Sequence, residues 1–163
     1  MCFSKVLPYL FILSILTACS GQSAVKYNNM VVEMDSELKP AMESAESQIG
    51  KYAEIPQWDS VGAVSKRMEA LVDTKLERIT KKDPPDVAGA DEFKREVIRY
   101  FKYIRDIYTS YGRLAAQSTE QARLKEYERF VEMVKSKRQV AEAFQAALQK
   151  FTRANNIRTE PNK

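Results

Sequence analysis

The sequence predicts an all-α protein, folded as an antiparallel, up-down-up-down four-helix bundle. Three observations support this fold class. The 163 residues include only five glycines and six prolines, fewer than the many turns of an all-β protein require. Long stretches are rich in Glu, Lys, Arg, Gln, Ala, Leu and Met, which favour helix. From Tyr27 onward, apolar residues recur at every third or fourth position, as they do on one face of a helix.

Residues 1–18 have the layout of a signal peptide. Lys5 supplies a positive charge near the start, and an apolar stretch of roughly 13 residues follows it. A membrane-spanning helix needs about 20 apolar residues, so this stretch is too short to be a transmembrane anchor. Two small residues, Thr17 and Ala18, close the segment. We therefore expect residues 1–18 to be cleaved and the bundle to stand behind them.

The motif Leu16-Thr17-Ala18-Cys19 resembles the bacterial lipobox, in which an apolar residue and two small ones precede a cysteine. The resemblance implies that diacylglycerol is joined to the Cys19 thiol, that the signal peptidase cuts before this residue, and that the new amine is acylated. More than one acyl chain anchors a protein firmly, whereas a single chain binds only marginally. An ordinary secretory signal with a chance cysteine is the alternative.

The residues after the cysteine bear on location. Ser20 stands where an Asp retains lipoproteins at the inner membrane of well-studied diderm bacteria, so the lipobox resemblance favours the outer membrane for this chain. Whether the chain would lie on the periplasmic or the surface face of that membrane stays open. Residues 19–26 are small and polar for the most part, which is typical of a flexible linker, and they are predicted to form a lipidated tether.

The first helix is predicted from Tyr27 to Tyr52, where apolar residues step by three and four. Pro40 lies inside it, and a proline removes one helical hydrogen bond and clashes with the preceding turn, at a cost of about 3 kcal/mol. We therefore expect either a kink near Glu37 to Pro40 or two helices that meet there. The segment from Gly50 to Gln57 is predicted to end the element.

The second and third helices have recognisable ends. The second is predicted to start at Asp59 or Ser60, both favourable N-caps, and to end at Lys81-Lys82, where cations suit the helix dipole. The third is predicted to start at the cap Asp91. Its apolar stripe is the most strongly patterned of the chain and consists of Phe93, Val97, Tyr100, Phe101, Ile104, Ile107, Tyr108, Tyr111, Leu114 and Ala115.

The fourth helix is predicted as one long element. Ser118 or Thr119 caps it and Ala154-Asn155-Asn156 ends it, which gives about 35 residues, or ~50 Å, and an overhang beyond the second helix. Lys137-Arg138 occupy positions where the periodicity predicts an apolar residue. The long aliphatic parts of these side chains can cover apolar surface, so the helix need not end there. The bundle domain is thus residues 27–156, followed by a polar tail, 157–163. The stripe of this helix contains Tyr127, Phe130, Val131, Val134, Ala141, Phe144, Leu148 and Phe151.

The absence of histidine excludes many kinds of site. Ser-His and Cys-His catalysis and the commonest metal ligand cannot be built without it. Cys2 and Cys19 both precede the predicted bundle, so neither a disulfide nor a Cys-His zinc site can form within it. No Gly-rich phosphate loop occurs. We therefore expect no catalytic residue, no metal, no cofactor and no enzymatic activity. The acidic residues weighed as metal ligands fall off the apolar stripes: Glu33, Glu37, Asp106 and Glu132.

The charges argue against a nucleic-acid partner. The net charge is only +4 at pH 7, and basic residues alternate with acidic ones along the chain. A nucleic-acid binder concentrates its basic residues in one patch. The densest basic runs, Lys81-Lys82 and Lys135 to Arg138, are interpreted as solvated helix surface.

Tyr103 and Trp58 are the candidate contact residues. Tyr103 falls on the charged face of the third helix, and an exposed tyrosine suggests a contact surface. Trp58, the only tryptophan, lies in the link between the first and second helices, where it either joins a contact surface or seals the end of the core. The other aromatic residues of the third helix are interpreted as core, with an aromatic-lined ligand pocket between the first and third helices as the alternative.

As a whole, the chain resembles small, lipobox-bearing, all-helical envelope lipoproteins. This resemblance implies a non-enzymatic interaction or structural module, held at a membrane by the lipid on Cys19 and binding an envelope protein. The alternatives are a ligand-binding lipoprotein and, third, an enzyme of unrecognised type. Lys163 matches the terminal lysine through which the murein lipoprotein is joined to peptidoglycan, and a polar tail that ends in lysine by chance is the other interpretation.

Overall fold

The structure, a computed structural model, describes the backbone of residues 16–158 and the side chains of residues 21–158. Within these limits every regular element is a helix, so the all-α prediction is confirmed. Most of the predicted signal peptide (1–15), the Cys19 side chain and residues 159–163 with Lys163 lie outside the described residues. The helices are α1 (Leu16–Glu54), α2 (Trp58–Lys81), α3 (Ala90–Ala115), α4 (Glu120–Val134) and α5 (Lys137–Ala154).

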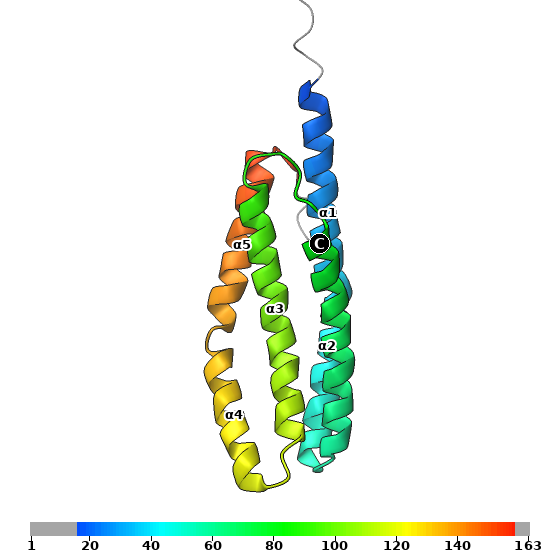
Figure 1. Ribbon diagram of the computed structural model, residues 1–163, viewed down its shortest axis with the longest axis vertical. Coiled ribbons are helices and arrows are strands. Elements are labelled where there is room, and N and C mark those ends of the chain that lie inside the picture. The colour runs from blue at the N-terminus through cyan, green and yellow to red at the C-terminus, as the bar shows by residue number, and fades with distance from the viewer. Residues whose placement is uncertain (1–15, 159–163) are drawn as a thin grey trace, which may run out of the picture.

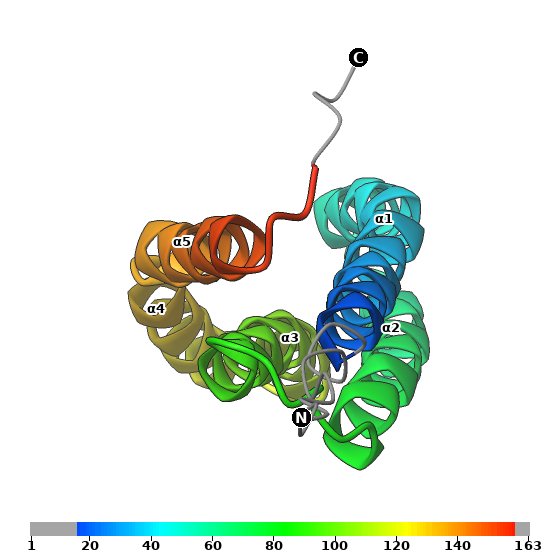
Figure 2. The ribbon, with the colours of Figure 1, turned by 90° about the horizontal axis from the view of Figure 1, so that it is seen from above.

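The helices follow an arc in which α1, α2 and α3 lie side by side. The backbone of α1 packs along α2, and α2 along α3, while α4 and α5 follow one another along the far side of α3 (Figure 1). Seen from above, the arc is open between α1 and the α4–α5 pair (Figure 2), and α1 approaches these two helices much less closely than it approaches α2. The N-terminal part of α1 projects beyond the other helices (Figure 1).

Helix α1 is longer and more continuous than the sequence predicts. It runs without a break from Leu16 through Pro40 to Glu54, so the prediction of a flexible tether over residues 19–26 and the option of two helices meeting at Pro40 are both wrong. The side chain of Ala24 is fully buried, which extends the packed face of the helix into the predicted tether. Pro40 is exposed to solvent, where water can bind the carbonyl group that loses its partner.

The predicted fourth helix is divided into α4 and α5 at Lys135 and Ser136. At this point the backbone N–H of Ser136 donates to the carbonyl oxygen of Met133 at 3.1 Å, three residues back instead of four. The Ser136 hydroxyl donates to the same oxygen at 2.8 Å. Serine competes with helical hydrogen bonds in this way, and the competition interrupts the helix.

The other boundaries lie close to their predicted places. The hydroxyl of Thr119 accepts a hydrogen bond from the N–H of Ala122 at 3.2 Å, which confirms Thr119 as the cap of α4. Helix α2 starts at Trp58, just before the predicted caps. Helix α3 starts at Ala90 after Gly89, whose φ of +77° favours glycine, so Asp91 lies in the first turn and is not the cap.

Aromatic side chains fill the core beside the N-terminal half of α1. The ring of Phe93 on α3 stacks on Phe151 of α5 with centroids 4.8 Å apart, and Tyr27 of α1 meets both rings edge-on at 6.2 Å. Tyr100 of α3 stacks on Phe144 of α5 at 4.4 Å. These contacts hold α1, α3 and α5 together at this level, although their backbones are not all in close contact.

Buried phenols make stability sensitive to alkaline pH. Burial, helped by the charge of Asp91, raises the pKa of Tyr27 to about 12, and burial likewise raises the pKa of Tyr100, Tyr108 and Tyr111. In the unfolded chain these phenols ionise near pH 10. The contribution of these phenols to the free energy of unfolding is therefore complete below about pH 10. It is lost as pH rises above that value, at up to about 1.4 kcal/mol per pH unit for each phenol.

We expect the urea midpoint to fall steadily above about pH 10 and to fall less in the variant Tyr27→Phe, which has no phenol to ionise. A midpoint that declines equally in both proteins would show that Tyr27 ionises alike in the folded and unfolded chains.

Helices α2 and α3 approach closely where small residues face each other. A Cβ atom placed on Gly112 would lie 3.1 Å from the Ser65 hydroxyl oxygen. Ser65 is fully buried and donates to the carbonyl oxygen of Tyr108, so it cannot easily move away. The small residues therefore determine how near the two helices lie.

The variant Gly112→Leu should lose about 1–3 kcal/mol of unfolding free energy, because a larger side chain forces α2 and α3 apart. Gly50→Leu is the matched control, since no atom lies within 4 Å of a Cβ there. It should gain up to about 1 kcal/mol from helix propensity. Urea denaturation of both variants measures the difference, and equal stability of the two would contradict the close approach.

Candidate contact surface

Helix α4 presents an apolar face to solvent. The side chains of Leu124, Tyr127 and Val131, the α4 stripe, are 56%, 52% and 40% exposed, and no residue of α4 is fully buried. The sequence predicts Tyr127 and Val131 as core residues, and for these two residues the prediction is wrong. The reason is that α4 packs mainly on α3, where Phe130 meets Tyr111 with ring centroids 4.7 Å apart. The α4 stripe lies beside Phe130 on the helix surface, where α3 leaves it largely exposed.

A hollow of about 500 Å³ adjoins the α4 stripe. We call it the end hollow. Its lining comes from the end of the molecule where the α1–α2 and α3–α4 links lie, and Figure 1 shows these two links at the same end. Its neighbour in the α1–α2 link, Ile55, is 53% exposed. The lining residues are Pro56, Trp58, Leu114, Glu120, Arg123, Leu124 and Tyr127.

Trp58 lies in the wall of the end hollow. Its ring is half-buried, and the guanidinium carbon of Arg123 lies 4.1 Å from the ring centroid. Arg123 also donates to the carbonyl oxygen of Gln117 at 2.5 Å, which ties α4 to the α3–α4 link. A cation over an indole face is a favourable contact and holds Trp58 in place. One part of Trp58 packs on the core, as expected of a residue that seals its end, and another part lines the end hollow, while its role in a contact surface stays a prediction.

Tyr103 lies elsewhere, against the junction of α4 and α5. It is half-buried, and burial raises the pKa of its phenol, while the nearby side chain of Ser136 acts in the opposite direction. It borders a shallow groove between α3 and α5 that is lined mostly by charged residues of α3. The expectation of an exposed tyrosine at this position is wrong, since the face of α3 that looks charged in sequence is covered here by the helix junction.

A second recess, the side depression, lies between α1 and α3, where the alternative interpretation expects a ligand pocket. Its volume is about 260 Å³. Tyr100 is the single aromatic side chain in its lining, and its hydroxyl donates to Asp35 at 2.9 Å. The other lining residues come from α1 and are mostly charged: Asp35, Lys39, Met42, Glu43 and Glu46.

The carboxyl groups with shifted pKa values belong to exposed ion pairs. A hydrogen bond from Lys75 lowers the pKa of Glu37, one from Lys81 lowers that of Glu77, and Lys150 does the same for Glu92. A general acid at neutral pH requires the opposite shift. In the part of the chain that the structure describes, no group of three or more acidic residues or cysteines is arranged to hold a metal ion.

Over the described residues, none of the helices combines the length and the apolar character needed to cross a membrane. Comparison of the chain with models of known protein families gave no match, and comparisons with curated proteins and with solved structures gave none either. The α4 stripe, the end hollow and the side depression are therefore the features from which a function can be inferred.

Proposed function

We propose that this chain is a lipid-anchored cell-envelope protein that acts as a non-enzymatic interaction module. In this proposal the lipid is carried by Cys19, and the α4 stripe with the adjoining end hollow is the contact surface. The observation that carries the proposal is the exposure of three large apolar side chains on one helix face, next to a tryptophan-lined recess. Contiguous exposed apolar patches mark interaction sites in soluble domains.

The length of α1 separates this surface from the predicted anchor. From Cys19 to Glu54 the chain is one continuous helix, which at 1.5 Å per residue spans about 54 Å. The lipid would lie at one end of this helix and the end hollow at the other. Such a surface suits a protein partner better than the membrane itself. The lipobox, the outer membrane suggested by Ser20 and the up-down-up-down bundle are all parts of the proposal.

Photo-crosslinking in cells tests the proposal. A photoreactive amino acid at Tyr127, in the middle of the α4 stripe, should give a discrete protein adduct. The same amino acid at Ala70, an exposed position on α2, is the control and should give none. Absence of a protein adduct from Tyr127, with the protein present and lipidated, would overturn the interaction module.

The alternative function, small-ligand binding, is favoured by the aromatic lining of the end hollow. Because Trp58 is the only tryptophan and lies in this lining, its fluorescence reports whether the hollow is occupied. A saturable change in that fluorescence with low-molecular-weight envelope fractions, together with no protein adduct from Tyr127, would favour the ligand-binding function.

A further inference from the structure

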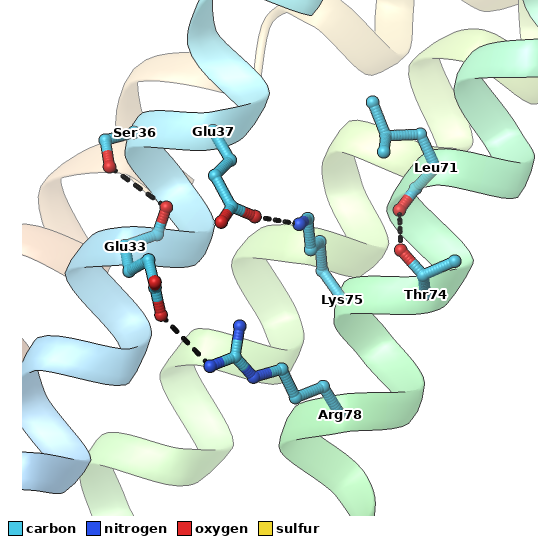
Figure 3. A network of polar contacts seen from close by, with 7 residues as sticks. All are labelled: Glu33, Ser36, Glu37, Leu71, Thr74, Lys75 and Arg78. Carbon is cyan, nitrogen blue, oxygen red and sulfur yellow. Dashed lines mark hydrogen bonds and ion pairs between the residues drawn. The ribbon is translucent and has the colours of Figure 1, made fainter.

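The acidic residues of α1 fall into two sets with different surroundings. Glu33 and Glu37 face α2, where Arg78 lies 3.0 Å from Glu33 and Lys75 pairs with Glu37 (Figure 3). These carboxylates are neutralised within the chain. They join α1 to α2 and present no free charge to a partner.

The second set, Asp35, Glu43 and Glu46, lines the side depression, and we call it the acidic wall. Within residues 21–158, none of the three forms an ion pair, although Asp35 accepts the hydrogen bond from Tyr100. Lys39 is the one basic residue in the lining. With three acidic residues and one basic residue, the lining of the side depression carries a net charge of −2.

The acidic wall faces the α4 side of the open arc. Tyr111 of α3 packs on Phe130 of α4, and the charge of Glu46 on α1 adds to burial in raising the pKa of the Tyr111 phenol, so α4 and the acidic wall both lie near this part of α3. Phe130, whose ring is 4.7 Å from that of Tyr111 and 6.5 Å from that of Tyr127, adds to this aromatic floor. We call the surface that runs from the acidic wall over these rings to the α4 stripe the groove between α1 and α4.

The groove between α1 and α4 is long enough for a helix of several turns. Asp35 and Glu46 are three helical turns apart on α1, or about 17 Å, and the α4 stripe extends over about 10 Å. An amphipathic helix with basic residues along one flank and apolar residues along the next would meet both walls at once. Helices dock into grooves of this kind through anchors spaced by three and four residues.

Two other occupants fit less well. An anionic membrane surface would be repelled by the acidic wall. A second copy of this chain, related by a two-fold axis, would present the same surface and bring two acidic walls toward each other, which is unfavourable.

We infer that the groove between α1 and α4 binds a basic amphipathic helix of another envelope protein, with the helix's apolar face on the α4 stripe and its basic flank on the acidic wall. The inference rests on the proposed interaction function and specifies the chemistry of its partner.

The test combines crosslinking from Tyr127 with charge reversal on α1. In the variant Glu43→Lys/Glu46→Lys, the yield of the protein adduct should fall about tenfold or more, since like charges across an interface cost at least the ~1.4 kcal/mol that a tenfold change requires. Asp83→Lys/Asp86→Lys changes the net charge equally in the exposed α2–α3 link and should leave the yield unchanged. Glu43→Gln/Glu46→Gln removes the charges without reversing them and should give an intermediate yield. This milder variant keeps the test valid if the charge-reversal variant does not fold.

Mapping the crosslinked peptide by mass spectrometry completes the test. A helical segment of the partner with Lys or Arg on one flank is expected, and replacing those residues by Glu should restore the adduct with Glu43→Lys/Glu46→Lys. An adduct that persists unchanged in both α1 variants would refute the basic helix but keep the interaction module. An adduct to a lipid or to a second copy of this chain would also refute the basic helix. Absence of any adduct from Tyr127 in the chain without the α1 substitutions would refute the interaction module itself.

Discussion

Replacing Phe93 by alanine should reduce the free energy of unfolding by about 3–5 kcal/mol, the range for truncating a buried phenylalanine. The Phe93 side chain is 1% exposed, stacks on Phe151 at 4.8 Å and meets Tyr27 at 6.2 Å. It therefore joins α1, α3 and α5 through side-chain contacts. A domain of this size has a total stability of about 5–15 kcal/mol, so the loss is a large part of it.

Leu124→Ala is the matched control for this prediction. Leu124 is 56% exposed, and truncating it should change the stability by no more than about 0.5 kcal/mol. Urea denaturation followed by circular dichroism measures both variants. A loss below about 1 kcal/mol for Phe93→Ala would mean that the three rings do not form one packed cluster. Leu124→Ala should still weaken crosslinking from Tyr127, which separates the contact surface from the core.

Apolar periodicity was sufficient to predict the helices and most of the core. Phe93, Val97, Phe101, Ile104 and Tyr108 all belong to the predicted stripe of α3, and each is buried. The reason is that α3 has neighbours on more than one side: α2 along one face, and α4 and α5 along another. Wherever a helix is surrounded in this way, its apolar stripe and its buried face coincide.

The same periodicity could not predict the α4 stripe. An apolar face indicates that something should cover a helix, but it does not indicate whether the cover comes from the same chain. In α4 the apolar residues occupy a wider arc than α3 alone can bury, because Phe130 faces α3 while Leu124 and Tyr127 face solvent. The sequence shows how wide the apolar face of α4 is. It does not show where α1 lies, and the position of α1 decides whether that face is covered.

Trp58 and Tyr103 illustrate how far single residues can be interpreted from sequence. The prediction placed Trp58 in a link and left open whether it contacts a partner, and it lines a recess next to exposed apolar side chains. Tyr103 was predicted as exposed because its sequence neighbours are charged. It is covered by the α4–α5 junction at Ser136, which depends on a local break in a helix that the pattern predicted to be continuous.

Substituting Cys19 by serine should abolish lipidation altogether, because serine has no thiol to receive diacylglycerol in the lipobox reaction. The matched control is Cys2→Ser, which removes the other cysteine of the chain but leaves Leu16-Thr17-Ala18-Cys19 intact. Labelling of cells with an alkyne-bearing fatty acid, followed by intact-mass measurement, distinguishes the two. Label should be lost completely in Cys19→Ser and retained in Cys2→Ser.

The consequence for location follows from the number of acyl chains. More than one chain holds a protein firmly at a bilayer, whereas the chain without its lipid has no described helix that could cross one. In Cys19→Ser the crosslinked partner should therefore be captured less often if it is itself bound to the membrane, even though the groove between α1 and α4 is unchanged. Label retained in Cys19→Ser, or lost in Cys2→Ser, would contradict the lipobox and remove the anchor from the proposed function, while the proposed contact role of the α4 stripe would be unaffected.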